Sequence, residues 1–161
     1  MITLTRRYHF SASHRLHVSA LSDEENLEHF GKCNNPFGHG HDYILSVTVS
    51  GLVDRRTGLI VNVKALDRLV RAKILDIFAH RNINLDVAHF GELVPTTENL
   101  ALVIASILEE HWGTWFDQQS RPSLYAVHLQ ETDRNGFEIC MRDLSGKPSL
   151  VRKPESVTVN A

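Results

Sequence analysis

The order of strand-like and helical segments constrains the fold of this chain more than any other feature of its sequence. Residues 2–14 and 39–51 come first, and each has its apolar side chains at alternate positions, as a half-buried strand does. Two segments of helical spacing follow, and two more strand-like segments, 124–132 and 137–142, flank Asp133-Arg-Asn-Gly136, which is typical of a hairpin turn. This ββααββ order predicts an α+β fold with two helices on one face of a four-stranded antiparallel sheet. So small a sheet leaves two open edges, which favours pairing with other copies of the chain.

Both helical segments begin at a predicted cap. Asn62 is the predicted N-cap of the first helix, and apolar residues follow it at helical spacing as far as Ile77. Thr96 is the predicted N-cap of the second helix. The links at residues 15–38 and 80–94 have no sustained period, so we expect irregular structure there.

Length and composition bound the class of protein. The 161 residues suffice for one well-buried domain, and 42% hydrophobic with 22% charged residues excludes a disordered chain or a coiled-coil rod. We expect a single domain over residues 1–161, with its core at about 1–143 and a polar C-terminal tail at 145–161. The net charge is −2 and no Lys/Arg cluster longer than a pair such as Arg55-Arg56 is visible, so no nucleic-acid partner is expected.

The N-terminal residues and the cysteines indicate a compartment. The first residues lack the apolar core of a secretory signal, and no apolar run approaches the ~20 residues that a membrane helix needs, so no membrane partner is expected. A cytoplasmic location follows as the expectation, and Cys33 and Cys140 are then predicted to be free thiols. Cys140 lies in the middle of a strand and is expected in the core.

Three of the ten histidines are placed for metal binding. His39 and His41 are two residues apart on a strand, so both side chains lie on one face, and His14 ends the preceding strand on the apolar parity. If the two strands pair, three imidazoles converge, which with one open position is a catalytic zinc arrangement that polarises a hydroxyl. The alternative is that each is an ordinary surface or hydrogen-bonded histidine. We give that reading to six others: His9, His17, His29, His89, His111 and His128.

Cys33 is separated from His39 by five residues in a polar stretch. A position in a loop near a cation such as Lys32 would favour its thiolate, which is a good base or nucleophile. A fourth zinc ligand that closes a structural site, a buried thiol and an inert loop residue are alternatives that the spacing leaves open.

Two further residues are candidates for the site. His80 follows a predicted helix end, where it would act as an acid or base, or alternatively as a helix cap favoured by the dipole. Glu131 shares the apolar parity of its strand, and a half-buried carboxylate needs a partner such as the N–H groups of a flat heterocycle. Its alternative is an ordinary exposed acid at a strand end.

Four motifs together resemble a known family. They are Phe10-Ser-Ala-Ser-His14, Cys33-Asn-Asn-Pro-Phe-Gly-His39-Gly-His41, Pro95-Thr-Thr-Glu-Asn99 and Glu131-Thr132, and in this order they resemble the 6-pyruvoyl-tetrahydropterin synthase family. The resemblance implies the tunnelling fold, whose ββααββ order agrees with the order above. It also implies trimers that close a barrel and stack as a homohexamer, a dimer of trimers, with sites between subunits.

The resemblance also implies roles for residues. His14, His39 and His41 would hold Zn²⁺, Cys33 would be the proton-abstracting base, and His80 would be the catalytic histidine.

The implied substrate is 7,8-dihydroneopterin triphosphate. Glu131 would anchor the pterin through its N–H and amino groups, with Thr96 and Thr97 nearby at a helix start. Loss of triphosphate and tautomerisation would give the 6-pyruvoyl product.

The chain departs from the family pattern at one position. Family members usually carry Asp immediately before the catalytic histidine, whereas this chain has Ala79 before His80. A carboxylate there would orient the imidazole and support the imidazolium, so its loss affects rate. We expect another acid, Asp86 or one from a neighbouring subunit, to substitute.

Two alternative functions remain at this point. The first, which the resemblance also allows, is another enzyme of the same family, the 6-carboxy-tetrahydropterin synthase of queuosine biosynthesis. That enzyme usually has three residues between the cysteine and the His-Gly-His motif. The second is a non-catalytic zinc- or pterin-binding module, in which Cys33 is a fourth zinc ligand. A further branch carries glutamate in place of the cysteine, and Cys33 argues against it.

Overall fold

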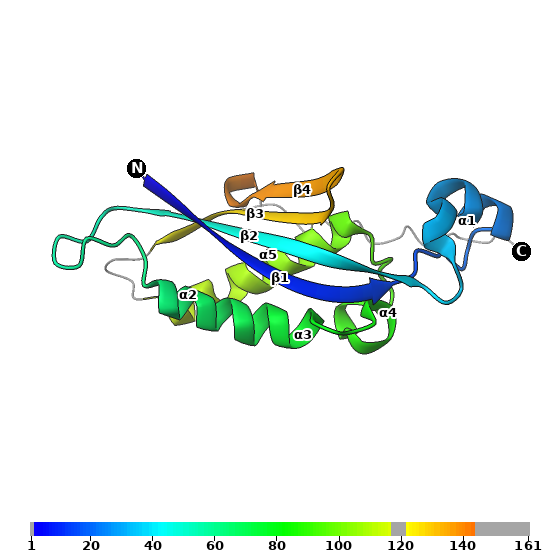
Figure 1. The fold of residues 1–161 in the computed structure, drawn as a ribbon, viewed down its shortest axis with the longest axis horizontal. Coiled ribbons are helices and arrows are strands. Elements are labelled where there is room, and N and C mark those ends of the chain that lie inside the picture. The colour runs from blue at the N-terminus through cyan, green and yellow to red at the C-terminus, as the bar shows by residue number, and fades with distance from the viewer. Residues whose placement is uncertain (1, 117–121, 144–161) are drawn as a thin grey trace, which may run out of the picture.

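Four antiparallel strands form the sheet of this chain. The computed structural model describes residues 2–116 and 122–143, and the sheet order is β1-β2-β3-β4 (Figure 1). The strands are β1 (Ile2–His14), β2 (His39–Gly51), β3 (Ser123–Thr132) and β4 (Asn135–Cys140). The predicted α+β class and ββααββ order of the main elements are confirmed.

Two long helical segments cover one side of the sheet (Figure 1). The first is continuous and consists of α2 (Val63–Val70), the π-helical turn η2 (Arg71–Leu75) and α3 (Asp76–Phe78), and the second is α5 (Thr97–Trp115). Both predicted caps are confirmed, because the Asn62 side chain accepts a hydrogen bond from the Ala65 N–H and the Thr96 hydroxyl accepts one from the Asn99 N–H.

The core lies between these helices and the apolar face of the sheet. Leu66, Ile74 and Ile104 from the helices and Leu45 and Val47 from β2 are all fully buried, with 0% of their surface exposed. The alternate strand positions point to the opposite face of the sheet, where most side chains are polar, among them His9, Ser11 and His128. The strand residues whose side chains point to the apolar face are therefore the ones that can approach each other beside α5.

An arm of helix occupies the link that we expected to be irregular. It contains α1 (Asp23–Phe30) and the 3₁₀ turn η1 (Gly31–Asn34). The expectation of an irregular link was therefore wrong. The one residue that α1 buries is Asn26, so the helix has no stripe of apolar residues by which the sequence could indicate it. A capping box marks the helix start: Ser22 accepts from the Glu25 N–H, and the Glu25 carboxylate accepts from the Ser22 N–H.

Short helices also occupy the second link and the end of the chain. α4 (Ile83–Asp86) and η3 (Ala88–Phe90) lie in the link at residues 80–94, again where irregular structure was expected, and η4 (Met141–Asp143) follows β4. β4 begins and ends two residues earlier than the predicted strand at residues 137–142. The Thr132 hydroxyl accepts hydrogen bonds from the backbone N–H groups two and three residues later, which tightens the hairpin.

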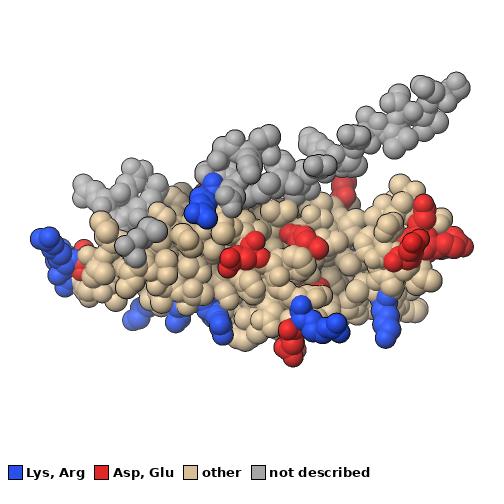
Figure 2. All heavy atoms as spheres, turned by 90° about the horizontal axis from the view of Figure 1, so that it is seen from above, with Lys and Arg blue, Asp and Glu red and all other residues tan. Residues whose placement is uncertain are grey.

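Residues 145–161 fall outside the described part of the chain, and no helix within residues 2–116 and 122–143 is long and apolar enough to cross a membrane. Cys33 and Cys140 are free thiols, as predicted, but Cys140 is only half-buried on β4 and does not belong to the core. Acidic and basic side chains are both spread over the face in Figure 2.

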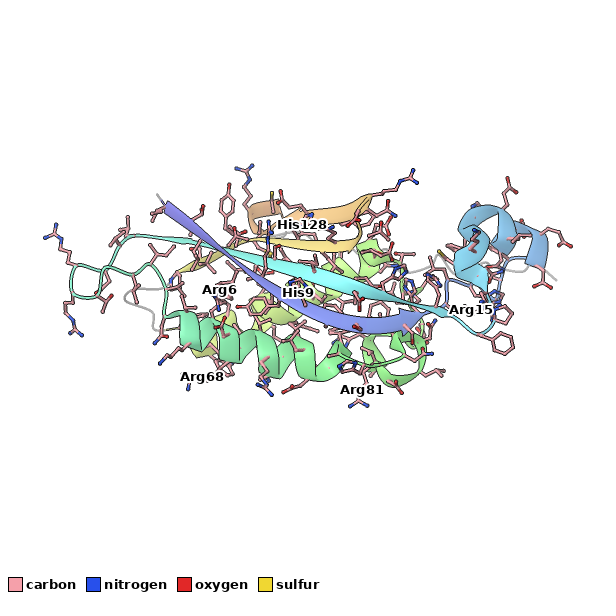
Figure 3. All side chains as sticks on the ribbon, viewed as in Figure 1. Arg6, His9, Arg15, Arg68, Arg81 and His128 are labelled. Atoms are coloured by element: carbon pink, nitrogen blue, oxygen red, sulfur yellow. The ribbon has the colours of Figure 1, made fainter. Side chains whose placement is uncertain are left out.

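A charged cluster fastens β1 to α2. Asp67 accepts two hydrogen bonds from Arg6, which is labelled in Figure 3, at 2.7 and 3.1 Å and one from the Tyr8 hydroxyl at 2.8 Å. Burial alone would raise the pKa of Asp67, but the hydrogen bonds from Arg6 and Tyr8 and the charge of Arg6 together hold it below its ordinary value. The ionised carboxylate is therefore favoured in the folded state.

We expect Asp67→Asn to lower the free energy of unfolding at pH 7, and the deficit to disappear in acid. Because the pKa of Asp67 is lower in the folded state, its contribution is present above the unfolded pKa and is lost as pH falls through the folded pKa. The Arg6 and Asp67 side chains are 40% and 38% exposed, so solvent screening limits the difference to about 1 kcal/mol or less. Urea unfolding of both proteins at pH 7 and pH 3 measures it, and a deficit that persists undiminished at pH 3 would contradict the assignment.

Candidate metal centre and active site

The register of β1 on β2 builds a cluster of three histidines. His14 is the pairing partner of His39, and Ala12 is the partner of His41, so all three imidazoles stand on the same face at one end of the sheet. The turn that leads into β2 depends on Gly38, which has φ +69° and whose added Cβ would lie 2.9 Å from the His14 carbonyl oxygen. The predicted convergence of the three histidines is confirmed.

The histidine cluster presents its ring nitrogens to a common centre. One ligand atom from each of His14, His39 and His41 lies within 4.8 Å of the others, and the Nε2 atoms of His14 and His39 are 3.3 Å apart. The carbonyl oxygen of Pro95 lies 2.8 Å from Nδ1 of His14. This bond requires the proton on Nδ1, which leaves the Nε2 lone pair free for a ligand.

The donor set fits zinc. Nε2 of His41 is buried with no hydrogen-bond partner among the described residues, as a ligand atom would be. Burial lowers the pKa of His14 and of His39, which favours the neutral imidazoles that bind metal. Two nitrogens on one tetrahedral Zn²⁺ stand about 3.3 Å apart, given Zn–N distances of about 2.0–2.1 Å. Cys33 is outside this group, so the three histidines leave a ligand position open.

Glu131 faces the histidine cluster from β3. Its Oε1 lies 3.6 Å from Nε2 of His41 and 3.8 Å from Nε2 of His14, and its side chain is 13% exposed. The Thr97 hydroxyl, at the start of α5, donates a hydrogen bond to the same oxygen at 2.5 Å. Thr96 has a different task, since its hydroxyl caps α5. The carboxylate is thus held beside the histidine cluster, and is not an exposed acid at a strand end.

Cys33 lies in η1 beside the end of β1. The Leu16 N–H donates to the Cys33 carbonyl oxygen at 2.9 Å, and the Arg15 guanidinium, labelled in Figure 3, donates to the Asn34 carbonyl oxygen at 3.1 Å. Burial, followed by the negative charge of Glu131, raises the pKa of the Cys33 thiol. Our expectation that local cations would favour the thiolate was wrong for the protein groups alone, because the adjacent Lys32 is exposed to solvent.

His80 stands apart from the histidine cluster. Ala79 is the C-cap of α3, and His80 follows it with a left-handed φ of 60° and an exposed side chain. Its N–H donates to the Ser11 carbonyl oxygen at 2.7 Å, which places it along the outer edge of β1. Among the described residues, no hydrogen bond or ring contact joins His80 to the three histidines or to Cys33.

Asp86, the expected substitute acid, is engaged in its own helix. Its Oδ2 accepts a hydrogen bond from the Asn82 N–H at 2.8 Å, which closes the start of α4. The expectation that it orients His80 gains no support from this contact.

Sequence reasoning missed two groups of the site. Pro95 was recognised only as part of a helix start, yet its carbonyl oxygen orients His14. Tyr43 is fully buried, its ring centroid lies 5.7 Å from that of His41, and its hydroxyl has no partner among the described residues. Its position two residues after His41 on the same strand face was the available signal. The other face of the sheet carries His9 and His128 (labelled in Figure 3), opposite the histidine cluster, as their parity predicts.

Comparison with known proteins decides the family. Residues 3–141 match the profile described as "6-pyruvoyl tetrahydropterin synthase". The chain belongs to the 6-pyruvoyl tetrahydropterin synthase family. A relative in that family, the 6-pyruvoyl tetrahydrobiopterin synthase of Drosophila melanogaster, is 46% identical over 133 residues, which cover 82% of this chain and 75% of that protein.

A solved structure agrees with this membership, and a relative named for a second activity is less similar to the chain. The structure of Caenorhabditis elegans 6-pyruvoyl tetrahydropterin synthase has a TM-score of 0.76 and 39% identity, and covers 86% of this chain and 94% of its own. A 6-carboxy-5,6,7,8-tetrahydropterin synthase from Rickettsia bellii is 28% identical over 117 residues, which cover 63% of this chain and 76% of that protein. The Drosophila melanogaster and Caenorhabditis elegans proteins, which are named for the 6-pyruvoyl product, are thus markedly more similar in sequence to this chain than the Rickettsia bellii protein is.

Proposed function

We propose that this chain is a zinc-dependent 6-pyruvoyl-tetrahydropterin synthase, which converts 7,8-dihydroneopterin triphosphate to 6-pyruvoyl-tetrahydropterin and releases triphosphate. The observation that carries the proposal is the group of three histidines with an open position, faced by the Glu131 carboxylate. Family membership supports the choice of reaction, as does the greater identity to the Drosophila melanogaster 6-pyruvoyl enzyme than to the Rickettsia bellii 6-carboxy enzyme.

His14, His39 and His41 are the proposed zinc ligands. Bound Zn²⁺ would supply positive charge that polarises the side-chain hydroxyls of the substrate, acidifies the adjacent C–H bonds and favours the thiolate of Cys33. The Pro95 carbonyl keeps the His14 ring in the tautomer that can coordinate. The protein thus supplies a fixed, neutral, three-nitrogen site.

Cys33, His80 and Glu131 are the proposed groups that act on the substrate. Cys33 abstracts the proton from the substrate side chain and His80 transfers a second proton, as general bases and acids do. Glu131 accepts hydrogen bonds from the N–H and amino groups of the pterin, and Thr97 holds its carboxylate in place. Thr96 contributes by capping the helix that carries Thr97.

The separation of His80 from the other groups supports an assembled active site. We expect His80 of one copy to complete the site of a neighbour, within a homohexamer formed as a dimer of trimers. β1 is an edge strand, and its outer edge pairs with residues 80–82 only near Ser11 and Ser13 within the described part of the chain, so the rest of that edge can pair with another copy. The hexamer and a cytoplasmic location stay predictions.

The product decides between the candidate functions. Zinc-loaded protein incubated with 7,8-dihydroneopterin triphosphate should yield the 6-pyruvoyl product and triphosphate by mass spectrometry, and chelated protein should yield neither. A 6-carboxy product with acetaldehyde would assign the chain to the second candidate activity. Unchanged substrate, with zinc verified in the protein, would contradict catalysis and favour a binding module.

A further inference from the structure

A pocket at the end of β1, bounded by residues 80–82 on one side and by β2 on the other, is lined by the strained His80. Its volume is about 410 Å³, and its lining includes His80 and Asn82 from the segment after α3, Ser11 from β1 and Asp42 from β2. Asp42 is the one carboxylate among the residues that line it, and Arg81 and His41 are the other ionisable residues there. The pocket therefore joins the histidine proposed for proton transfer to a single acid.

Residues 80–82 extend the sheet beside β1. The His80 N–H donates to the Ser11 carbonyl oxygen at 2.7 Å, the Ser13 N–H donates to the Arg81 carbonyl oxygen at 2.9 Å, and Ser13 and Asn82 form a parallel bridge. These bonds hold His80 at φ 60°, a conformation that costs free energy for a residue with a Cβ. Such strain persists where surrounding structure imposes it, and it is common at functional sites.

Ser11 lies between His80 and Asp42. Ser11 and Asp42 are cross-strand partners, and the Ser11 hydroxyl donates to Oδ1 of Asp42 at 2.5 Å. Neighbouring strands are about 4.8 Å apart, so His80, Ser11 and Asp42 follow one another across the edge of the sheet. A hydroxyl has one proton and two lone pairs; with its proton committed to Asp42, Ser11 retains acceptor capacity for an imidazole N–H.

We propose that Asp42, acting through the Ser11 hydroxyl, is the positioning carboxylate for His80, in place of the acid that is absent at Ala79. This inference rests on the proposed function. In the proposed arrangement the imidazole N–H of His80 donates to Ser11, while the Ser11 hydroxyl donates to Asp42 as it does in this structure, and together the two bonds select one tautomer and one ring orientation. The negative charge of Asp42 supports the imidazolium that forms when His80 accepts a proton. Asp86 takes no part, because its carboxylate closes α4.

Asp42→Asn tests the proposal by kinetics. We expect kcat to fall at least about tenfold with KM little changed, because orientation and charge act on proton transfer rather than on substrate binding. Zinc content should stay at the wild-type ratio, and Ser11→Ala should reduce kcat in the same way. The matched control is Asp76→Asn, an exposed acid on α3 outside the pocket, which should leave kcat unchanged.

Rescue separates positioning from a merely structural role. Ala79→Asp added to Asp42→Asn supplies a carboxylate next to His80 and should restore most of the lost kcat. An unchanged kcat in Asp42→Asn, a loss of zinc in that variant, or a low kcat that Ala79→Asp does not raise would each overturn the proposal.

A measurement without turnover keeps the inference independent of the reaction. In ¹⁵N NMR of the zinc-loaded protein, with the His80 ring signals assigned through His80→Gln, wild type should show one dominant tautomer, which Asp42→Asn should redistribute. Equal tautomer populations in both proteins would overturn the positioning role. If the wild type is inactive but Asp42→Asn still redistributes the tautomers, the proposed function is rejected, and the hydrogen-bonded link from His80 through Ser11 to Asp42 is supported.

Discussion

His39→Ala should empty the metal centre and reduce synthase activity by more than about a hundredfold. Loss of even an outer-shell partner of a zinc-bound histidine costs about 10–100-fold in affinity or activity, and His39 is proposed as a direct ligand. Its Nε2 lies 3.3 Å from that of His14, so its removal leaves two of the three nitrogens. The zinc content measured by elemental analysis should fall from one zinc per chain to far below one.

The matched control is His128→Ala. His128 lies on β3 opposite Ser46, on the sheet face that does not carry the metal centre, so zinc and activity should be retained. One zinc per chain in His39→Ala, or equal losses in both variants, would contradict the assignment of the site.

Cys33→Ala should keep its zinc and lose turnover. General acid–base groups contribute about 10²–10⁴-fold, and we expect a loss of kcat in that range. Zinc should stay because Cys33 lies outside the three-nitrogen group. Product formation and the zinc-to-protein ratio, measured on the same sample, separate the two effects.

Cys140→Ala provides the control for Cys33→Ala. This thiol is also free and half-buried, but it lies on β4 opposite Ala126, away from the histidine cluster. Its replacement should change neither measurement. A Cys33→Ala protein that loses zinc would instead support a closed, four-ligand site and the binding-module alternative.

The parts of the site that lie on strands could be predicted because side chains alternate along a strand. His14 ends one strand and His39 begins the next, so antiparallel pairing of two adjacent segments brings them together with no further information. Glu131 was placed on the correct face by the same alternation. The capped helices followed from apolar spacing and from Asn62 and Thr96.

The remaining features depend on contacts between distant segments. The pKa of Cys33 is raised by its burial and by Glu131, which is far away in sequence. The tautomer of His14 depends on the Pro95 carbonyl, and the strained backbone of His80 depends on Ser11. α1 escaped detection because it projects from the body and buries only Asn26, so it has no apolar stripe to read.

The proposed metal ligands and the proposed base belong to different parts of the architecture. The three histidines are on paired strands whose register is set by cross-strand contacts as far as Ile2 and Gly51, whereas Cys33 is on the arm between those strands. Insertions or deletions in that arm can alter the reach and angle of the thiol while the nitrogen donors stay where they are. The fold thus places the three nitrogen donors and the proposed base on separate segments. The reaction can therefore diversify among relatives while the proposed metal site keeps its geometry.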